Sequence, residues 1–294
     1  MEKNPLVSIC LPVYNGTPLV RRALQSCIDQ TYENLEIVVV DDGSKDNTVP
    51  VVKEFMAKSP KVKLFQNEKN LGGAAKNFLR SYEVASGYFV NHMGHDDWLD
   101  PNYIEEKVKV FMEHPEVLIV SNGFAAYFVK DDNDEPVFMN KLRKRPGFYK
   151  NSEIYKRFYK EPGLIGMSSM ARREDVLKNY LIDIPNNYGY LPHYTRSMVI
   201  DNMLMLRIMA TKDRDASTVF YTDKTFYNGL EHPTNISRTY GWLKMGNIDD
   251  ALKFNHIDRV GYEYFFKTYD SEDLQSYRLF MGYKTLGDIV FMAL

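Results

Sequence analysis

Residues 35–48 read LEIVVVDDGSKDNT, an apolar run that ends in two aspartates and a polar turn. The centre of the run, Val38 to Val40, is apolar at successive positions, as in a parallel strand that helices cover on both faces. Other short apolar runs flank it in the chain and alternate with amphipathic segments, a pattern typical of βαβ units. The sequence therefore predicts an α/β fold with a mostly parallel sheet built around residues 35–41.

The strands expected in this sheet are short and rich in β-branched residues: Val7–Tyr14, Leu35–Asp41, Val62–Gln66, Tyr88–His92 and Val117–Ser121. Amphipathic spacing predicts helices between them: Pro18–Gln30, Thr48–Lys58, Gly72–Ala85 and Pro101–Glu113, with Asp100 as the N-cap of the last. After Ser121 we expect a hairpin with an acidic turn and the basic stretch Lys141–Arg145. Helical patterns resume at Ser152–Tyr159, Arg173–Asn179, Ile200–Ala210 and from Ser237 onward.

Composition limits the classes of protein that fit. The chain has 294 residues, 44% of them hydrophobic and 14% aromatic, which is enough for a substantial core. Its 37 basic and 39 acidic residues nearly cancel, so nucleic acid is not an expected partner. Cys10 and Cys27 lie in apolar patterns and are expected to be buried. Because no signal-peptide pattern and no apolar run of about 20 residues is seen, we expect a cytoplasmic location, with peripheral contact at the inner membrane face left open.

Polar side chains follow three of the expected strands. Tyr14 and Asn15 follow the first, Asp42 the second, and Asp96 the fourth. Ligands of open α/β sheets bind at the carboxyl ends of the strands, so these residues are expected to meet at one edge. There Asp42 could accept the imide N–H of uracil while Tyr14 packs against the base. A polar turn that ends at a helix N-cap explains the residues after Asp41 equally well.

Asp96 and Asp97 are adjacent acids at the end of the fourth strand. Carboxylate oxygens suit Mg²⁺ or Mn²⁺, and such an ion could bridge a diphosphate. Two acids before a helix can also serve only to favour its N-terminal dipole. Their position at the strand end favours the metal-ligand interpretation.

Several motifs together resemble family 2 glycosyltransferases of the GT-A fold, of the kind that assemble bacterial glycans and cell-envelope polysaccharides. They are Val7-Ser8-Ile9-Cys10-Leu11-Pro12-Val13-Tyr14-Asn15, Gln30-Thr31-Tyr32, Glu36 to Thr48 and Asn70-Leu71-Gly72-Gly73-Ala74-Ala75-Lys76-Asn77. The resemblance covers about residues 5–240. It implies a Rossmann-like central sheet flanked by helices, a GT-A domain at 1–240 and a C-terminal helical extension at 241–294. Residues 1–120 would be the nucleotide-binding half and 121–240 the acceptor-binding half.

The resemblance also implies roles for single residues. Donor-binding positions would be Pro12, Tyr14, Asn15, Asp42, Lys76 and Asp96, and the Mn²⁺ or Mg²⁺ ligands would be Asp97, Asp96 and His232. The family usually has an acid where this chain has Gly94, so the share of each neighbouring residue in metal binding is open. Asp201 matches the aspartate of the family's Glu-Asp motif and would be the catalytic base. A helix N-cap is the alternative for Asp201, and a surface loop position is the alternative for His232.

The sequence thus predicts an inverting hexosyltransferase that moves a sugar from a nucleotide-diphosphate sugar, first of all a UDP-sugar, to a glycan or lipid-linked acceptor. A non-catalytic sugar-nucleotide-binding or scaffold protein is one alternative, because Gly94 replaces an acid. A nucleotidyltransferase is another, although the first loop has a single glycine, Gly16, and no nearby lysine. The aromatic C-terminal extension is a candidate for contact with a membrane surface or a second copy of the chain.

Overall fold

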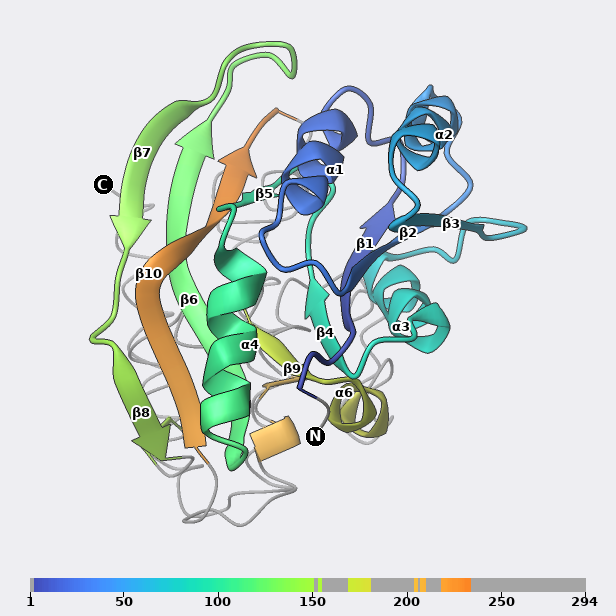
Figure 1. Cartoon of the computed structure of the whole chain (residues 1–294). Coiled ribbons are helices and arrows are strands. Elements are labelled where there is room, and N and C mark those ends of the chain that lie inside the picture. The colour runs from blue at the N-terminus through green and yellow to red at the C-terminus, as the bar shows by residue number, and fades with distance from the viewer. Residues whose placement is uncertain are drawn as a thin grey trace, which may run out of the picture.

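The computed structural model describes residues 3–150, 153–154, 169–180, 204–205, 207–209 and 218–233. Within these residues the strands form a ten-stranded sheet in the order β3-β2-β1-β4-β9-β6-β10-β5, with β7 beside β6 and β8 beside β10 (Figure 1). The four strands β3, β2, β1 and β4 run parallel, and β6 and β10 form a second parallel pair. The predicted α/β class and its central, mostly parallel sheet are confirmed.

The strands are β1 Val7–Val13, β2 Leu35–Asp41, β3 Val62–Gln66, β4 Phe89–His92, β5 Trp98–Leu99, β6 Val117–Phe128, β7 Val137–Leu142, β8 Gly147–Lys150, β9 Met170–Arg172 and β10 Thr218–Glu231. The helices described in full are α1 Val20–Ile28, α2 Thr48–Lys58, α3 Ala74–Val84, α4 Tyr103–Glu113 and α6 Arg173–Asn179. The order of alternating strands and helices as far as α4 follows the predicted pattern.

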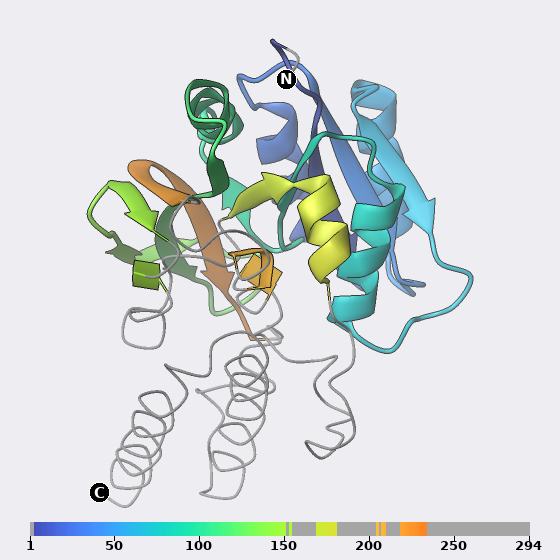
Figure 2. The same ribbon diagram turned by 90° about the horizontal axis from the view of Figure 1, so that it is seen from below.

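Helices cover both faces of the sheet (Figure 2). Ile9 and Leu11 of β1 lie in a buried cluster with residues of α1, α2 and α4. Cys10, together with Val38 and Val40 of β2, points the other way into a cluster with residues of α3 and α6. Both free cysteines are buried, as predicted, and burial raises the pKa of their thiols. Alternate residues of the central strands thus serve two cores, which leaves the strand ends as the accessible part of this sheet.

Three predictions about local structure need correction. The strand predicted to end at Ser121 continues to Phe128 as β6, and the expected hairpin joins it to β7. The long strand β10 was not predicted. Asp100 does not cap α4, whose N-cap residue is Asn102. Instead, the Asp100 carboxylate accepts hydrogen bonds from the Phe226 N–H at 2.9 Å and from Asn228 Nδ2 at 3.0 Å, because β10 passes beside it.

Several predictions concern residues outside those described. Asp201 is one of them, and the predicted extension at 241–294 is another. Of the helix expected at Ile200–Ala210, residues 204–205 and 207–209 are described and helical, and Leu204, Met205, Ile208 and Met209 are buried in the core on the α3 face. In the part of the chain that the structure describes, no helix is long and apolar enough to cross a membrane.

Candidate active site

The loops after β1 and β2 are fastened to each other by hydrogen bonds. The Asn15 N–H donates to Ser44 Oγ and the Lys45 N–H donates to Asn15 Oδ1, both at 2.8 Å. The Gly16 N–H donates to Thr48 Oγ1, also at 2.8 Å. Asn15 has a positive φ of 50°, a conformation that asparagine adopts more readily than most residues. Asn15 is therefore a residue that joins the two loops, and together they form one wall at the edge of the sheet.

Asp41 shapes the turn after β2. Its carboxylate accepts hydrogen bonds from the N–H groups of Gly43 and Ser44, each at 3.2 Å, in an Asx-type turn. Gly43 has a φ of 77°, which a residue without a Cβ adopts at little cost. The carboxylate of Asp41 is thus used within the protein itself.

Asp42, the next residue, is held by hydrogen bonds from the loop between β3 and α3. Its side chain is buried, and Oδ1 accepts hydrogen bonds from Asn67 Nδ2 at 2.8 Å and from the Leu71 N–H at 2.9 Å. Asn70 Nδ2 donates to the Asp42 carbonyl oxygen at 3.0 Å, which ties the loop before α3 to the same residue. Among the described residues no hydrogen bond reaches Oδ2. Asp42 therefore offers one fixed carboxylate oxygen to a donor such as an imide N–H.

The other predicted donor-site residues lie at different depths. The Tyr14 side chain is 46% exposed at the end of β1, next to the loop of Asn15. Pro12 is buried inside β1, opposite Val40 of β2. Lys76 is exposed in the first turn of α3. The structure thus brings Tyr14 and Asn15 to the edge where Asp42 lies, with Pro12 beneath them.

The acid loop, which we define as residues 94–100, lies between β4 and α4, includes the short strand β5 and runs beside β10. Asp96 Oδ2 lies 3.0 Å from His232 Nε2, just past the end of β10. Asp97 Oδ2 accepts a hydrogen bond from Tyr227 Oη at 2.5 Å, and its Oδ1 accepts one from the Leu230 N–H at 2.9 Å. Both oxygens of Asp97 therefore have partners inside the protein, and Asp96 lies against a different residue, His232.

The pKa shifts of the two acids separate them further. Burial, and then the negative charge of Asp96, raise the pKa of Asp97 well above its usual value. Burial alone would raise the pKa of Asp96 as well, but the hydrogen bond with His232 and the charge of His95 outweigh it and lower that pKa. The negative charge of the pair is therefore concentrated on Asp96.

The acid loop approaches the wall formed by the first two loops at Gly16. A Cβ added to Gly16 would lie 2.7 Å from His95 Cδ2 and 2.5 Å from Val13 Cγ2, both too close for a side chain. His95 thus packs directly over the loop after β1. This contact joins the acid loop to the wall that carries Asp42.

Asp96 and His232 fit a divalent metal ion as a pair of ligands. A carboxylate oxygen and an imidazole nitrogen meet there, and His232 Nδ1 lies 3.5 Å from Asp132 Oδ1. Among the residues that the structure describes, no group of three or more His, Cys, Asp or Glu side chains could hold an ion. Mg²⁺ and Mn²⁺ commonly use one or two protein ligands and complete their shell with phosphate oxygens and water. The site therefore fits an ion that arrives with a diphosphate.

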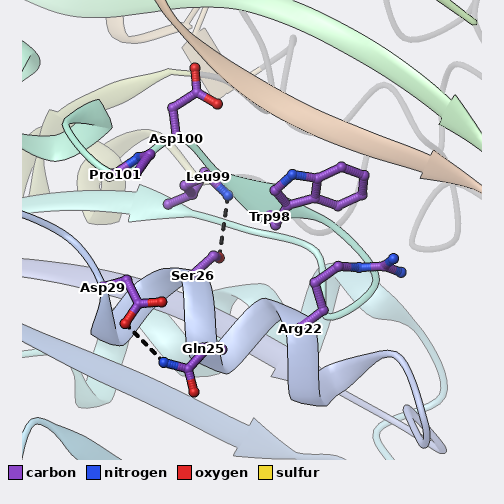
Figure 3. Close-up of a pocket in the computed structure, with 8 residues that line it drawn as sticks. All are labelled: Arg22, Gln25, Ser26, Asp29, Trp98, Leu99, Asp100 and Pro101. Atoms are coloured by element: carbon purple, nitrogen blue, oxygen red, sulfur yellow. Dashed lines mark hydrogen bonds between the residues drawn. The ribbon is translucent and has the colours of Figure 1, made fainter. Parts of the chain in front are cut away.

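A cleft of 430 Å³ adjoins the acid loop, between α1 and residues 98–101 (Figure 3). Arg22, Gln25 and Ser26 of α1 and Asp29, the C-cap residue of α1, line it, and their spacing places them on one face of the helix. The guanidinium carbon of Arg22 lies 4.7 Å from the centre of the Trp98 ring, a cation–π contact. Trp98 directly follows Asp97, so this contact packs α1 against the acid loop.

The sequence interpretation missed the residues that hold the acids in place. They are Asn67, which holds Asp42, and Tyr227 and the Leu230 backbone, which hold Asp97. The stretch Thr218–Leu230 is rich in β-branched and aromatic residues, a signal for a strand that could have been used. Nothing local in that stretch indicates which loop it contacts.

Comparison with known proteins points to one family. The family model described as "Glycosyl transferase family 2" matches residues 8–179, more than half of the chain. An uncharacterized glycosyltransferase of Rickettsia typhi is 36% identical over 138 residues, which cover 44% of this chain and 42% of the relative. A chondroitin synthase of Pasteurella multocida is 30% identical over 138 residues, which cover 42% of this chain and 14% of the relative. The alignments thus span less than half the length of either relative.

Two solved structures have similar folds. S. aureus TarS in complex with UDP-GlcNAc gives a TM-score of 0.59 at 18% identity, over 92% of this chain and 74% of that chain. The mannosyltransferase PcManGT from Pyrobaculum calidifontis, in complex with GDP-Man and Mn²⁺, gives a TM-score of 0.58 at 16% identity, over 99% and 73% of the two chains. At such identities the likeness concerns the fold.

Proposed function

Because the chain belongs to glycosyl transferase family 2 and has the GT-A fold, we propose that it transfers a sugar from a nucleotide-diphosphate sugar to a hydroxyl group. The donor we favour is a UDP-sugar, the acceptor a glycan or a lipid-linked saccharide, and the stereochemical course inversion. These finer assignments are proposals about this chain.

The observation that supports the proposal is that the loop with Asp42 and the acid loop with Asp96 lie at the same edge of the sheet. Asp42 lies at the end of β2 with one carboxylate oxygen toward the ligand side, and Asp96 lies with His232 beyond the end of β4. The contact of His95 with Gly16 brings the two loops together. A nucleotide base at Asp42 and a diphosphate at Asp96 would span this edge, with Tyr14 available to pack against the base.

Asp96 and His232 would hold Mn²⁺ or Mg²⁺, with the remaining positions filled by diphosphate oxygens and water. When bound, the ion would offset the negative charge that develops on the leaving diphosphate. Asp97, expected from the sequence to be a ligand as well, is assigned here to holding the acid loop, because Tyr227 and Leu230 occupy its oxygens. The PcManGT complex, which contains Mn²⁺, supports this choice of metal.

Asp201 is the proposed catalytic base. Its carboxylate would take the proton of the acceptor hydroxyl as that oxygen attacks the anomeric carbon. Asp201 lies outside the described residues, but the helical residues that follow it are buried: Leu204 and Met205 belong to the core beneath the sheet. A catalytic base needs a fixed position, and buried residues a few positions further along the chain support this assignment.

Uracil as the base of the nucleotide is supported by the one carboxylate oxygen of Asp42 that no described residue binds. Uracil presents one imide N–H, which one carboxylate oxygen can accept, whereas guanine presents two adjacent N–H groups. The TarS complex contains UDP-GlcNAc and the PcManGT complex contains GDP-Man, so both nucleotides belong in the test.

Thermal unfolding with UDP, GDP and their sugars, each with and without Mn²⁺, tests the donor site. A ligand at about 100 times its Kd adds about 2.7 kcal/mol of stability, so UDP with Mn²⁺ should raise Tm by several degrees. Asp42→Asn should reduce that rise, while Asp29→Asn, the same change at the exposed C-cap residue of α1, should not. If no nucleotide raises Tm, the donor-site proposal is wrong.

Turnover distinguishes the catalytic proposal from its alternative. Gly94 in place of an acid favours a non-catalytic sugar-nucleotide-binding protein. Slow, metal-dependent release of UDP from a UDP-sugar would exclude that alternative. Asp201→Asn should abolish the release and leave the thermal shift with UDP and Mn²⁺ unchanged. Unaltered release by this variant would refute Asp201 as the base.

A further inference from the structure

The end of β10 and the residue after it, together residues 226–232, contact each acid of the acid loop. The Phe226 N–H binds Asp100, Tyr227 Oη and the Leu230 N–H bind Asp97, and His232 lies against Asp96. The loop therefore takes its shape from this strand, which lies more than a hundred residues away in the chain.

Tyr227 makes the most central of these contacts. Its Oη accepts a hydrogen bond from the Gly94 N–H at 2.9 Å and donates one to Asp97 Oδ2 at 2.5 Å. The side chain is fully buried, and its ring is held between Phe124, at a centroid distance of 5.9 Å, and Tyr103, at 6.4 Å. The hydroxyl is thus fixed in space and bridges the first residue of the acid loop to its second acid.

Gly94 is the counterpart of Tyr227 in this arrangement. A Cβ at position 94 would lie 2.6 Å from Asp96 Oδ1 and 2.7 Å from Asp97 Oδ2, closer than any side chain tolerates. Asp97 cannot move aside without losing its bonds to Tyr227 and Leu230. A side chain at position 94 would therefore have to displace the carboxylate of Asp96.

We propose that Tyr227 is a positioning residue that sets the Asp96 carboxylate for metal and diphosphate, and that the loop depends on glycine at position 94. This proposal rests on the proposed function and adds a specific claim to it. The acid that the family usually carries at this position has not simply been lost here. The carboxylates of Asp96 and Asp97 lie where a side chain at position 94 would be, and the Tyr227 hydroxyl holds the loop in this conformation through Gly94 and Asp97.

The positioning role and a simple loss of a metal ligand predict opposite effects of placing an acid at position 94. If Gly94 marked only a missing acid, Gly94→Asp would strengthen metal-dependent binding. In the arrangement described, Gly94→Asp adds both a clash and a further carboxyl group beside the buried side chains of Asp96 and Asp97, and Gly94→Ala adds the clash alone. Both variants should weaken metal-dependent binding.

Tyr221 provides a matched control for Tyr227. It lies on the same strand, is equally buried, and its hydroxyl also accepts a backbone hydrogen bond, from the Lys144 N–H at 3.0 Å. It makes no contact with the acid loop among those of the described residues. Tyr227→Phe and Tyr221→Phe both remove one buried hydroxyl, so a general loss of stability should affect both.

The experiment measures UDP affinity by calorimetry with and without Mn²⁺, and Mn²⁺ binding by electron paramagnetic resonance in the presence of UDP. Tyr227→Phe should lower the Mn²⁺-dependent part of the UDP affinity by about tenfold or more, the usual effect of losing a residue that orients a metal ligand. UDP affinity without metal should stay within about twofold, and Tyr221→Phe should keep the full metal effect. Gly94→Ala and Gly94→Asp should both lose it.

The outcomes separate the two proposals. If the wild-type protein binds neither UDP nor GDP, the proposed function fails and the positioning role with it. If it binds a nucleotide but Mn²⁺ adds nothing to that binding, the proposed metal site fails and the positioning role with it. If the wild-type protein shows the metal effect and Tyr227→Phe retains it, or Gly94→Asp strengthens it, the positioning role alone is overturned. Should Tyr227→Phe not fold, the two Gly94 variants carry the same test.

Discussion

Replacing His92 with phenylalanine is expected to make stability less dependent on pH. His92 ends β4, directly before the acid loop, and its side chain is only 3% exposed. Its ring packs edge-on against Phe78, at a centroid distance of 5.1 Å, and against Tyr82, at 6.5 Å. Burial, and then the positive charge of Lys107, lower the pKa of His92 from 6.5 to about 3.

The size of the effect on the free energy of unfolding follows from the difference in proton binding between the folded and the unfolded protein. The folded protein keeps His92 neutral between pH 7 and pH 5, whereas the unfolded chain takes up a proton as the pH falls through 6.5. The unfolded state then binds more protons, so the free energy of unfolding falls as the pH falls. The loss attributable to His92 is about 2 kcal/mol between pH 7 and pH 5, and it stops growing near the folded pKa of about 3.

Urea unfolding at pH 7, 6 and 5 and constant ionic strength measures this loss. The wild-type protein should lose about 2 kcal/mol more than His92→Phe over that range. Contacts of the imidazole that phenylalanine does not replace shift the variant equally at each pH, so only the difference in slope matters. Parallel curves for the wild type and His92→Phe would refute the assignment of a neutral, buried histidine.

Two further predictions concern other parts of the sheet edge and its support. Burial would raise the pKa of Glu36, but its hydrogen bonds from Lys63 and Ser8 lower it overall, so the stability that it contributes is present above its ordinary pKa and is lost as the pH falls below it. Unfolding between pH 5 and pH 3 should therefore show a smaller loss for Glu36→Gln than for the wild type, and an equal loss would contradict the assignment. Gly16→Ala should cost about 1–3 kcal/mol by overpacking against His95 and should weaken UDP binding, which calorimetry would detect; wild-type affinity would show that this contact is not needed.

The first half of the fold could be predicted from local pattern, and much of the rest could not. The predicted bounds of β2 and α2 match the structure residue for residue, because each segment has a regular pattern of apolar residues and recognisable boundary residues. β10 interrupts its pattern with the polar residues Thr222 to Lys224, where its register with β6 also shifts. β5 has two residues and β9 three, too few to show a period. Such strands exist because their neighbours offer hydrogen bonds, which no local pattern reveals.

The candidate site divides in the same way. The position of Asp42 could be predicted, because it follows an unmistakable central strand. The role of Asp97 in holding the acid loop could not be predicted, because its partner Tyr227 lies 130 residues further on, in a strand that was not predicted. Asp100 was expected to cap a helix, as its local sequence favours, but it binds the backbone of β10 instead. In these cases a tertiary contact decides between two local uses of the same side chain.

The two Asp-Asp pairs of the site share one feature. In each pair the two adjacent carboxylates have different partners within the protein. Asp41 turns inward to bind backbone N–H groups, and Asp42 keeps one oxygen for the ligand side. Asp97 turns inward to Tyr227, while Asp96 meets His232. In each pair one acid shapes the loop, and its hydrogen bonds hold the other in place. The second aspartate of a pair is the ligand-facing one after β2 and the inward one after β4, so the role follows from the loop and not from the order of the residues.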